Sequence, residues 1–137
     1  MPIITGSIDE NRQPIINVLI GVHGGEESDI FPIPLLAMID TGATMTGISA
    51  KVAGILKLKS LGKQSMTSVH GVTEEETYSI SISFFDSDHQ PHKPHHNIKA
   101  AGHRSDLNGV EVIIGCDVLG RCVYIHDGIR QTFTLSF

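Results

Sequence analysis

Hydrophobic and polar residues alternate along much of this chain with the two-residue period of β-strands. The clearest case is residues 78–84, where Tyr, Ile, Ile and Phe are separated by three serines. Longer apolar runs over residues 14–22, 32–39 and 110–114 are typical of strands that lie inside a domain. The pattern therefore predicts a mostly β protein.

Signals for helices are few. Residues 49–58 have room for one or two helical turns, and residues 117–122 have room for one more near the C-terminus. The dipeptide Asp127-Gly128 lies between two further apolar segments, 123–126 and 133–137, and this arrangement predicts a hairpin. We expect an all-β fold with one short C-terminal helix.

The length and charge of the chain narrow its possible roles. Its 137 residues are enough for a single domain, 1–137, and no linker or repeat is visible. The chain has 10 Lys and Arg against 15 Asp and Glu, a net charge of −5, so nucleic acid is not an expected partner. No secretion signal or membrane-spanning run is present, so we expect a cytoplasmic protein without a membrane partner.

One apolar strand runs directly into an acidic residue. Residues 35–39 are followed by Asp40, Thr41 and Gly42. A carboxylate at the end of a buried strand either ionises at a desolvation cost or has partners arranged for it. Gly42 permits a tight turn, and Thr41 places a hydroxyl beside the acid. The same residues are good turn material, so a plain turn at a strand end is an open alternative.

A second segment makes the pattern specific. Residues 113–119 are Ile-Ile-Gly-Cys-Asp-Val-Leu, and residues 38–43 are Met-Ile-Asp-Thr-Gly-Ala. Together they resemble the motifs of the retroviral-type aspartic proteases, the retropepsins. The terminal segments 2–5 and 132–137 are similar to the strands that interleave between two retropepsin subunits. The resemblance implies a retropepsin-like acid protease fold, with closed, barrel-like sheets and a flap hairpin.

The resemblance also implies how the chain would work. Asp40 would be the catalytic residue, and Thr41 and Gly42 would support the active site. The chemistry needs two carboxylates about 3 Å apart that share a proton, and this chain contains one Asp-Thr-Gly. We therefore expect a homodimer in which two copies of Asp40 form the catalytic dyad, without a cofactor.

Three segments are expected to contact an extended peptide substrate. They are the catalytic loop, a flap hairpin within residues 65–77 and the Ile-Ile-Gly strand. A plain surface hairpin with solvated glutamates is the alternative for the second of these segments. The residues expected to bind substrate are Gly42, Ala43, Thr44, Gly71, Val72 and Ile113.

The active-site motifs differ from those of some relatives. Thr44 and Cys116 stand where some viral members have an acid and an arginine that form an ion pair. Because both charges are missing together, we expect a neutral contact there. Ala43 stands where pepsin-type enzymes usually have a hydroxyl residue, which predicts a mildly acidic pH optimum. We also expect Cys116 to be buried and Asp117 to cap the helix that follows.

A histidine-rich segment raises a separate hypothesis. Four imidazoles within eight positions could bind Zn²⁺, Ni²⁺ or Cu²⁺. The alternative is a solvated loop, because two prolines keep the segment extended and no cysteine accompanies it. The residues concerned are His89, His92, His95 and His96.

The sequence leads to one main hypothesis and one alternative. The main hypothesis is an aspartic endopeptidase, a peptide hydrolase that acts as a homodimer on extended peptides. The alternative is a non-catalytic peptide-binding or dimerisation module of the same fold, with or without metal bound by the histidine-rich loop.

Overall fold

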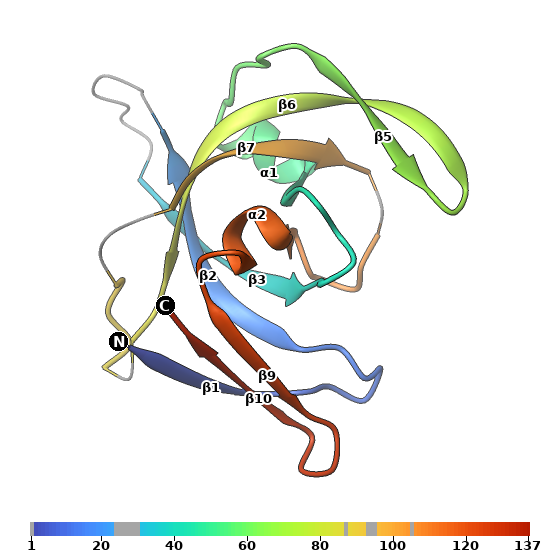
Figure 1. Cartoon of the computed structure of the whole chain (residues 1–137). Coiled ribbons are helices and arrows are strands. Elements are labelled where there is room, and N and C mark those ends of the chain that lie inside the picture. Colours follow the sequence, from blue (N-terminus) through green and yellow to red (C-terminus); the bar gives the residue numbers. More distant parts are fainter. Residues whose placement is uncertain (1, 24–30, 87, 93–95, 105) are drawn as a thin grey trace.

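The computed structural model describes residues 2–23, 31–86, 88–92, 96–104 and 106–137 (Figure 1). Its elements, in chain order, are β1 (Ile3–Ser7), β2 (Ile15–Val22), β3 (Ile33–Ile39), β4 (Gly47–Ser49), α1 (Ala50–Ile55), β5 (Lys63–Ser68), β6 (Gly71–Phe84), β7 (His96–His103), β8 (Val112–Ile114), α2 (Cys116–Leu119), β9 (Val123–Asp127) and β10 (Thr132–Ser136). The expectation of an all-β fold with one short C-terminal helix is confirmed.

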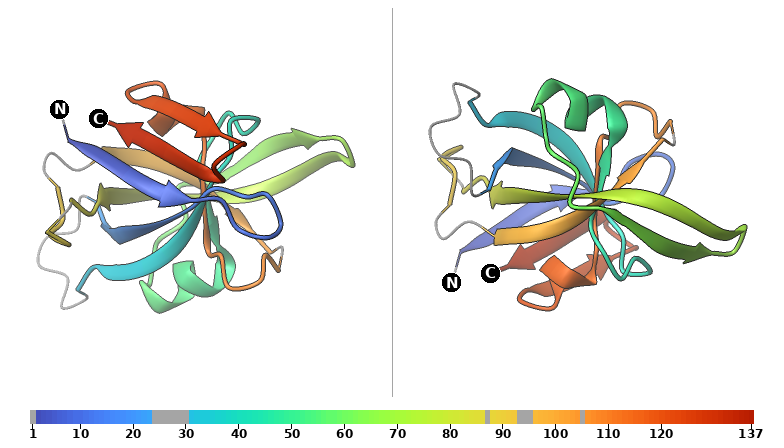
Figure 2. Two further views of the ribbon diagram at one scale, coloured as in Figure 1. Left: turned by 90° about the horizontal axis from the view of Figure 1, so that it is seen from below. Right: turned by 90° about the horizontal axis from the view of Figure 1, so that it is seen from above.

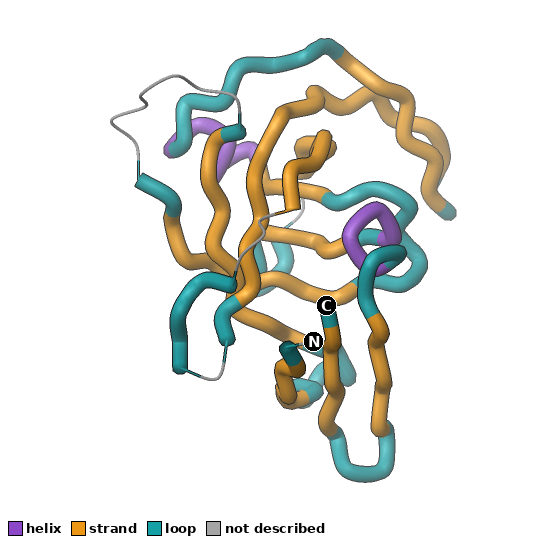
Figure 3. Tube along the Cα trace, turned by 60° about the vertical axis from the view of Figure 1, so that its left-hand side comes forward, coloured by secondary structure: helices purple, strands orange, loops and turns teal. Residues whose placement is uncertain are grey.

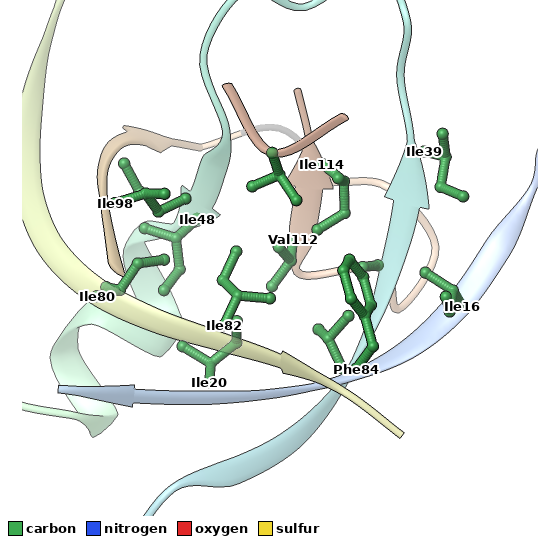
Figure 4. Close-up of a cluster of buried hydrophobic side chains, with 14 of the residues drawn as sticks. Ile16, Ile20, Ile39, Ile48, Ile80, Ile82, Phe84, Ile98, Val112 and Ile114 are labelled. Atoms are coloured by element: carbon green, nitrogen blue, oxygen red, sulfur yellow. The ribbon is translucent and has the colours of Figure 1, made fainter. Parts of the chain in front are cut away.

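Six strands close into a barrel. Hydrogen-bonded neighbours follow the order β2, β3, β8, β4, β7 and β6, and β6 pairs again with β2. The side chains on the inner faces of these strands fill one hydrophobic core, which Figure 4 shows in close-up. The closed, barrel-like arrangement expected from the sequence is therefore confirmed.

Strand β6 shows how the sequence pattern produces this packing. Ile80, Ile82 and Phe84 are at most 1% exposed, and they alternate with serines on the other face. The strand is longer than the alternating segment 78–84, because its first half leaves the barrel and pairs with β5. Figure 1 shows this hairpin extending beyond the barrel.

Strand β8 lies between β3 and β4, although β3 and β4 are consecutive in the chain. Strands β3 and β8 are parallel, so both end at the same edge of the barrel, where Figure 4 shows Ile39 and Ile114 on the neighbouring ends. The loop of residues 40–46, which joins β3 to β4, therefore crosses the end of β8. A Cβ atom on Gly115 would lie 2.7 Å from the carbonyl carbon of Met45, so only glycine fits beneath this crossing.

The two ends of the chain pair with each other in a second sheet, in the order β1, β10, β9. The pairs run from Ile3 opposite Ser136 to Ser7 opposite Thr132. Figures 2 and 3 show this sheet on one side of the barrel, with both termini close together. The terminal segments are strands, as expected, and within this chain they pair with each other. Since β10 has a neighbour on each side, the outer edges of this sheet are β1 and β9.

The hairpin between β9 and β10 forms where Asp127-Gly128 predicted it. The Asp127 carboxylate accepts hydrogen bonds from the backbone N–H groups of Ile129 and Arg130. It also forms an ion pair with the Arg130 guanidinium, 2.9 Å away. The backbone and side-chain hydrogen bonds from Arg130 lower the pKa of Asp127. The turn is thus closed by its own side chain.

Both helices in the described part of the chain are short, and neither is long and apolar enough to cross a membrane. Ser49 caps α1, since its Oγ accepts a hydrogen bond of 3.2 Å from the N–H of Val52. Gly115 occupies the N-cap of α2, so the expectation that Asp117 caps this helix is wrong. Asp117 is the second residue of the helix, and its carboxylate contacts the loop that crosses β8.

The crossing over β8 generates a stability prediction. Gly115→Ala should lower the free energy of unfolding by about 1–3 kcal/mol, because the new methyl group meets backbone atoms that cannot move independently. Urea denaturation followed by circular dichroism measures the change. Gly54→Ala is the matched control, because a Cβ there meets no atom within 4 Å and alanine favours helix α1. Equal stability of Gly115→Ala and the original chain would contradict the prediction.

Candidate active site

Asp40 is the first residue after β3 and lies at the edge of the barrel where β8 also ends. Its backbone N–H donates a hydrogen bond of 2.9 Å to the carbonyl of Ile114, which continues the pairing of the two strands. Its side chain is partly buried. The rigid barrel therefore fixes the backbone of Asp40 while the carboxylate stays at the barrel edge.

The turn that local sequence suggests is present at Asp40. The N–H of Gly42 donates a hydrogen bond of 2.9 Å to Oδ1 of Asp40, and the N–H of Ala43 donates one of 3.2 Å to the Asp40 carbonyl. These bonds orient the carboxylate relative to its own loop. The turn and an active site are thus compatible, because the turn holds the acid in place.

Thr46 and Asp117 join the loop to the start of α2. Thr46 is fully buried, and its hydroxyl donates a hydrogen bond of 2.6 Å to Oδ1 of Asp117. Its N–H donates one of 2.9 Å to Oδ2 of Asp117, and its Oγ1 accepts one of 3.1 Å from the N–H of Gly115. The N–H of Asp117 in turn donates to the Thr44 carbonyl. These four hydrogen bonds therefore fasten the end of the loop that carries Asp40 to the start of α2.

Neutral hydrogen bonds join Cys116 to the loop of residues 40–46, at Ala43 and Thr41 rather than at Thr44 itself. The N–H of Cys116 donates a hydrogen bond of 2.7 Å to the carbonyl of Ala43, next to Thr44. The Sγ atom of Cys116 lies 3.3 Å from the carbonyl of Thr41, to which it donates. Cys116 is exposed, so the expectation that it is buried is wrong. Cys122 is partly buried, and its burial raises the pKa of its thiol.

The hairpin of β5 and the first half of β6 lies where the flap was expected. Ser68 pairs with Gly71, so the turn at the tip of the hairpin consists of Val69 and His70. Gly71 follows the turn with a φ of +119°, a conformation that favours glycine. Val72 is 66% exposed. Figures 1 and 2 show the hairpin extending on the side of the barrel where β3 ends, which is the side of Asp40.

Ile113 differs from its neighbours in strand β8. Val112 and Ile114 are fully buried in the core, whereas Ile113 is partly buried on the opposite face of the strand. It pairs with Met38 of β3 and with Gly47 of β4. Ile113 is thus not required to fill the core, and its role in a substrate pocket stays a prediction.

The histidine-rich segment follows β6 in the chain, and the structure describes only part of it. His95 lies outside the described residues. The ring of His92 packs against Phe137, with the two centroids 5.0 Å apart, and the ring of His96 packs against Phe84. His89 is exposed. No group of three metal-binding side chains occurs among the residues that the structure describes.

The contact between Thr46 and Asp117 was not identified from the sequence, and it can be tested. Thr46→Val should lower the free energy of unfolding by about 1–3 kcal/mol, because the Asp117 carboxylate loses a donor and the N–H of Gly115 loses its acceptor. Chemical denaturation measures the change. Thr46→Ser keeps the hydroxyl and should cost less. If the valine variant is as stable as the original chain, this network does not hold the loop.

The sequence matches no protein-family model and no curated protein sequence. Its fold, however, is similar to those of known aspartic proteases. A retropepsin-like aspartic protease from Rickettsia conorii has 16% identity and a TM-score of 0.65, with 98% of this chain and 91% of that chain covered. EIAV protease in complex with the inhibitor HBY-793 has 20% identity and a TM-score of 0.56, with 82% and 89% covered.

The fold is also similar to about half of a larger protein, an aspartic proteinase from Irpex lacteus. It has 14% identity and a TM-score of 0.54, and the alignment covers 99% of this chain but only 47% of that chain. The similarity therefore extends over at least 98% of this chain in two of the three comparisons. With the closed barrel, the crossing loop and the hairpin described above, these comparisons establish that the chain has a retropepsin-like fold.

Proposed function

We propose that this chain is an aspartic endopeptidase that acts as a homodimer on extended peptides. The observation that carries the proposal is the position of Asp40, which follows a barrel strand in a braced loop on the side where the flap hairpin projects. The retropepsin-like fold of the chain supports the same conclusion. The cytoplasmic location inferred from the sequence stays a prediction.

Asp40 would act together with its copy in the second chain. Two carboxyl groups about 3 Å apart cannot both be ionised, so they share one proton. The ionised carboxylate would take a proton from water while the water oxygen attacks the peptide carbonyl carbon, and the protonated carboxyl would donate to the carbonyl oxygen. The C–N bond would then break as the amine nitrogen receives a proton. Thr41, whose side chain is exposed beside Asp40, would brace the pair across the interface.

Two features support a homodimer. The chain has one Asp-Thr-Gly motif, and its whole length corresponds to about half of the aspartic proteinase from Irpex lacteus. The sheet of β1, β10 and β9 also has two outer strands whose edges can pair with another chain. A two-fold axis near this sheet would make the same surface available on both chains.

An extended peptide would bind between the catalytic loop and the flap. Both strands of the hairpin are exposed near its turn, so its backbone groups can hydrogen-bond to a peptide strand. Gly42 would let the substrate backbone approach the loop closely, because it lacks a side chain. The other residues that we propose to contact substrate are Ala43, Thr44, Gly71, Val72 and Ile113.

Removing the carboxylate tests the proposal. Asp40→Asn should reduce cleavage of an unfolded protein or peptide by about a thousandfold or more, because neither chain of the dimer can then activate water. Asp88→Asn is the control, since Asp88 is exposed in the segment after β6, which Figure 1 shows far from the end of β3, and its change should leave the rate unaltered. Undiminished cleavage by Asp40→Asn would show that the proposal is wrong. An original chain that binds peptides and never cuts them would favour the non-catalytic module.

The residue after Gly42 gives a pH prediction. Ala43 offers no hydroxyl to the carboxylate, so cleavage should be fastest at mildly acidic pH. Ala43→Ser adds a donor that favours the ionised carboxylate and should move the acidic limb of the pH–rate profile to lower pH. The profile of kcat/KM for both proteins measures this. An optimum of the original chain at strongly acidic pH would contradict the explanation.

A further inference from the structure

The flap hairpin has two faces that can be assigned from the pairing of β6. Residues 71–76 of this strand pair with β5, residues 77–82 pair with β7, and the end of the strand pairs with β2. The register runs through all three partners without an inserted residue. Side chains therefore alternate between the two faces from Gly71 to Phe84.

One of these faces looks toward the barrel interior. Ile80 and Ile82 point into the core, so every second residue before them lies on the same face. Beyond the edge of the barrel this face becomes the underside of the flap, on the side where Asp40 lies (Figure 1). By this alternation, Glu74 and Glu76 belong to the underside, and Glu75 belongs to the upper face.

The two glutamates of the underside differ in their neighbours. Glu76 pairs with Lys63 across the hairpin and accepts a hydrogen bond from the hydroxyl of Ser60. Glu74 is exposed and pairs with the uncharged Ser65. The charge of Glu74 is thus less compensated locally, which makes it the stronger attractor for a cation.

The segments around Asp40 contain no basic residue to oppose this charge. Residues 40–46 and 114–120 contain Asp40 and Asp117 but neither Lys nor Arg. Within the hairpin, residues 64–77 also lack Lys and Arg. In a homodimer every one of these charges is present twice. All the charged side chains of these three segments are carboxylates, so they attract positively charged substrates.

We propose that Glu74 makes the peptidase selective for substrates with Lys or Arg side chains beneath the flap, with Glu76 in a lesser role. This inference rests on the proposed function. Substrate residues at the outer positions of the bound peptide reach this part of the hairpin, whereas the residues that flank the cleaved bond lie nearer Asp40. The ion pair between Glu74 and the substrate side chain lies at the exposed rim of the flap. It therefore acts mainly on KM, and it weakens as salt screens the two charges.

Three peptides of the same length test the inference: one neutral, one with Lys and one with Glu at the outer positions. We expect kcat/KM for the Lys peptide to be about threefold to fivefold higher than for the neutral peptide at low salt. The Glu peptide should be cleaved more slowly than the neutral one. Both differences should nearly vanish at about 1 M salt.

Variants on the two faces of the flap separate the local effect from net charge. Glu74→Gln should bring the ratio between the Lys and neutral peptides close to one. Glu75→Gln removes the same charge from the upper face and should leave that ratio unchanged. A Glu75→Gln variant that loses the preference as completely as Glu74→Gln would overturn the assignment of faces.

The outcomes also separate this inference from the proposed function. If all three peptides are cleaved at the same rate, the selectivity proposal is wrong and the endopeptidase proposal stands. If no peptide is cleaved by the original chain while each binds, both proposals are wrong. A preference for the Lys peptide that disappears only in Glu74→Gln supports both.

Discussion

The crossing of the loop of residues 40–46 over the end of β8 is the constraint on which the rest of the site depends. It brings two segments about seventy residues apart into backbone contact, with no room for a side chain at Gly115. The buried Thr46 and the Asp117 carboxylate then fasten the loop to α2. Asp40 is held in this way by the barrel on one side and by a hydrogen-bonded network on the other.

The arrangement of the fold suits a chain that supplies one half of an active site. The barrel is complete within one chain, since β6 pairs with β2 to close it. The loop of residues 40–46 and the flap hairpin, by contrast, lie on the same side of this barrel, and Thr41, Gly42 and Thr44 are exposed there. The barrel is thus closed by strands of one chain, and the segments proposed to carry the chemistry lie at its edge.

Much of this could be predicted from the sequence, because alternation and motif spacing are local properties. The strands β2, β3 and β10, the hairpin at Asp127 and the location of the flap follow from such signals. The partnership of Thr46 with Asp117 could not be found, because it exists only once β8 lies beneath the loop. The exposure of Cys116 and the pairing of β1 with β10 within the chain depend likewise on long-range packing, which local patterns do not encode.

The central claim is that two chains must each contribute one Asp40 to a single active site. The most direct test is to unfold the original chain together with increasing amounts of Asp40→Asn chain, refold the mixture, and measure peptide cleavage. Mixed dimers would contain one carboxylate and be inactive, so activity per original chain should fall steadily as the variant is added. Activity that depends only on the amount of original chain would show that each chain works alone, and would contradict the account.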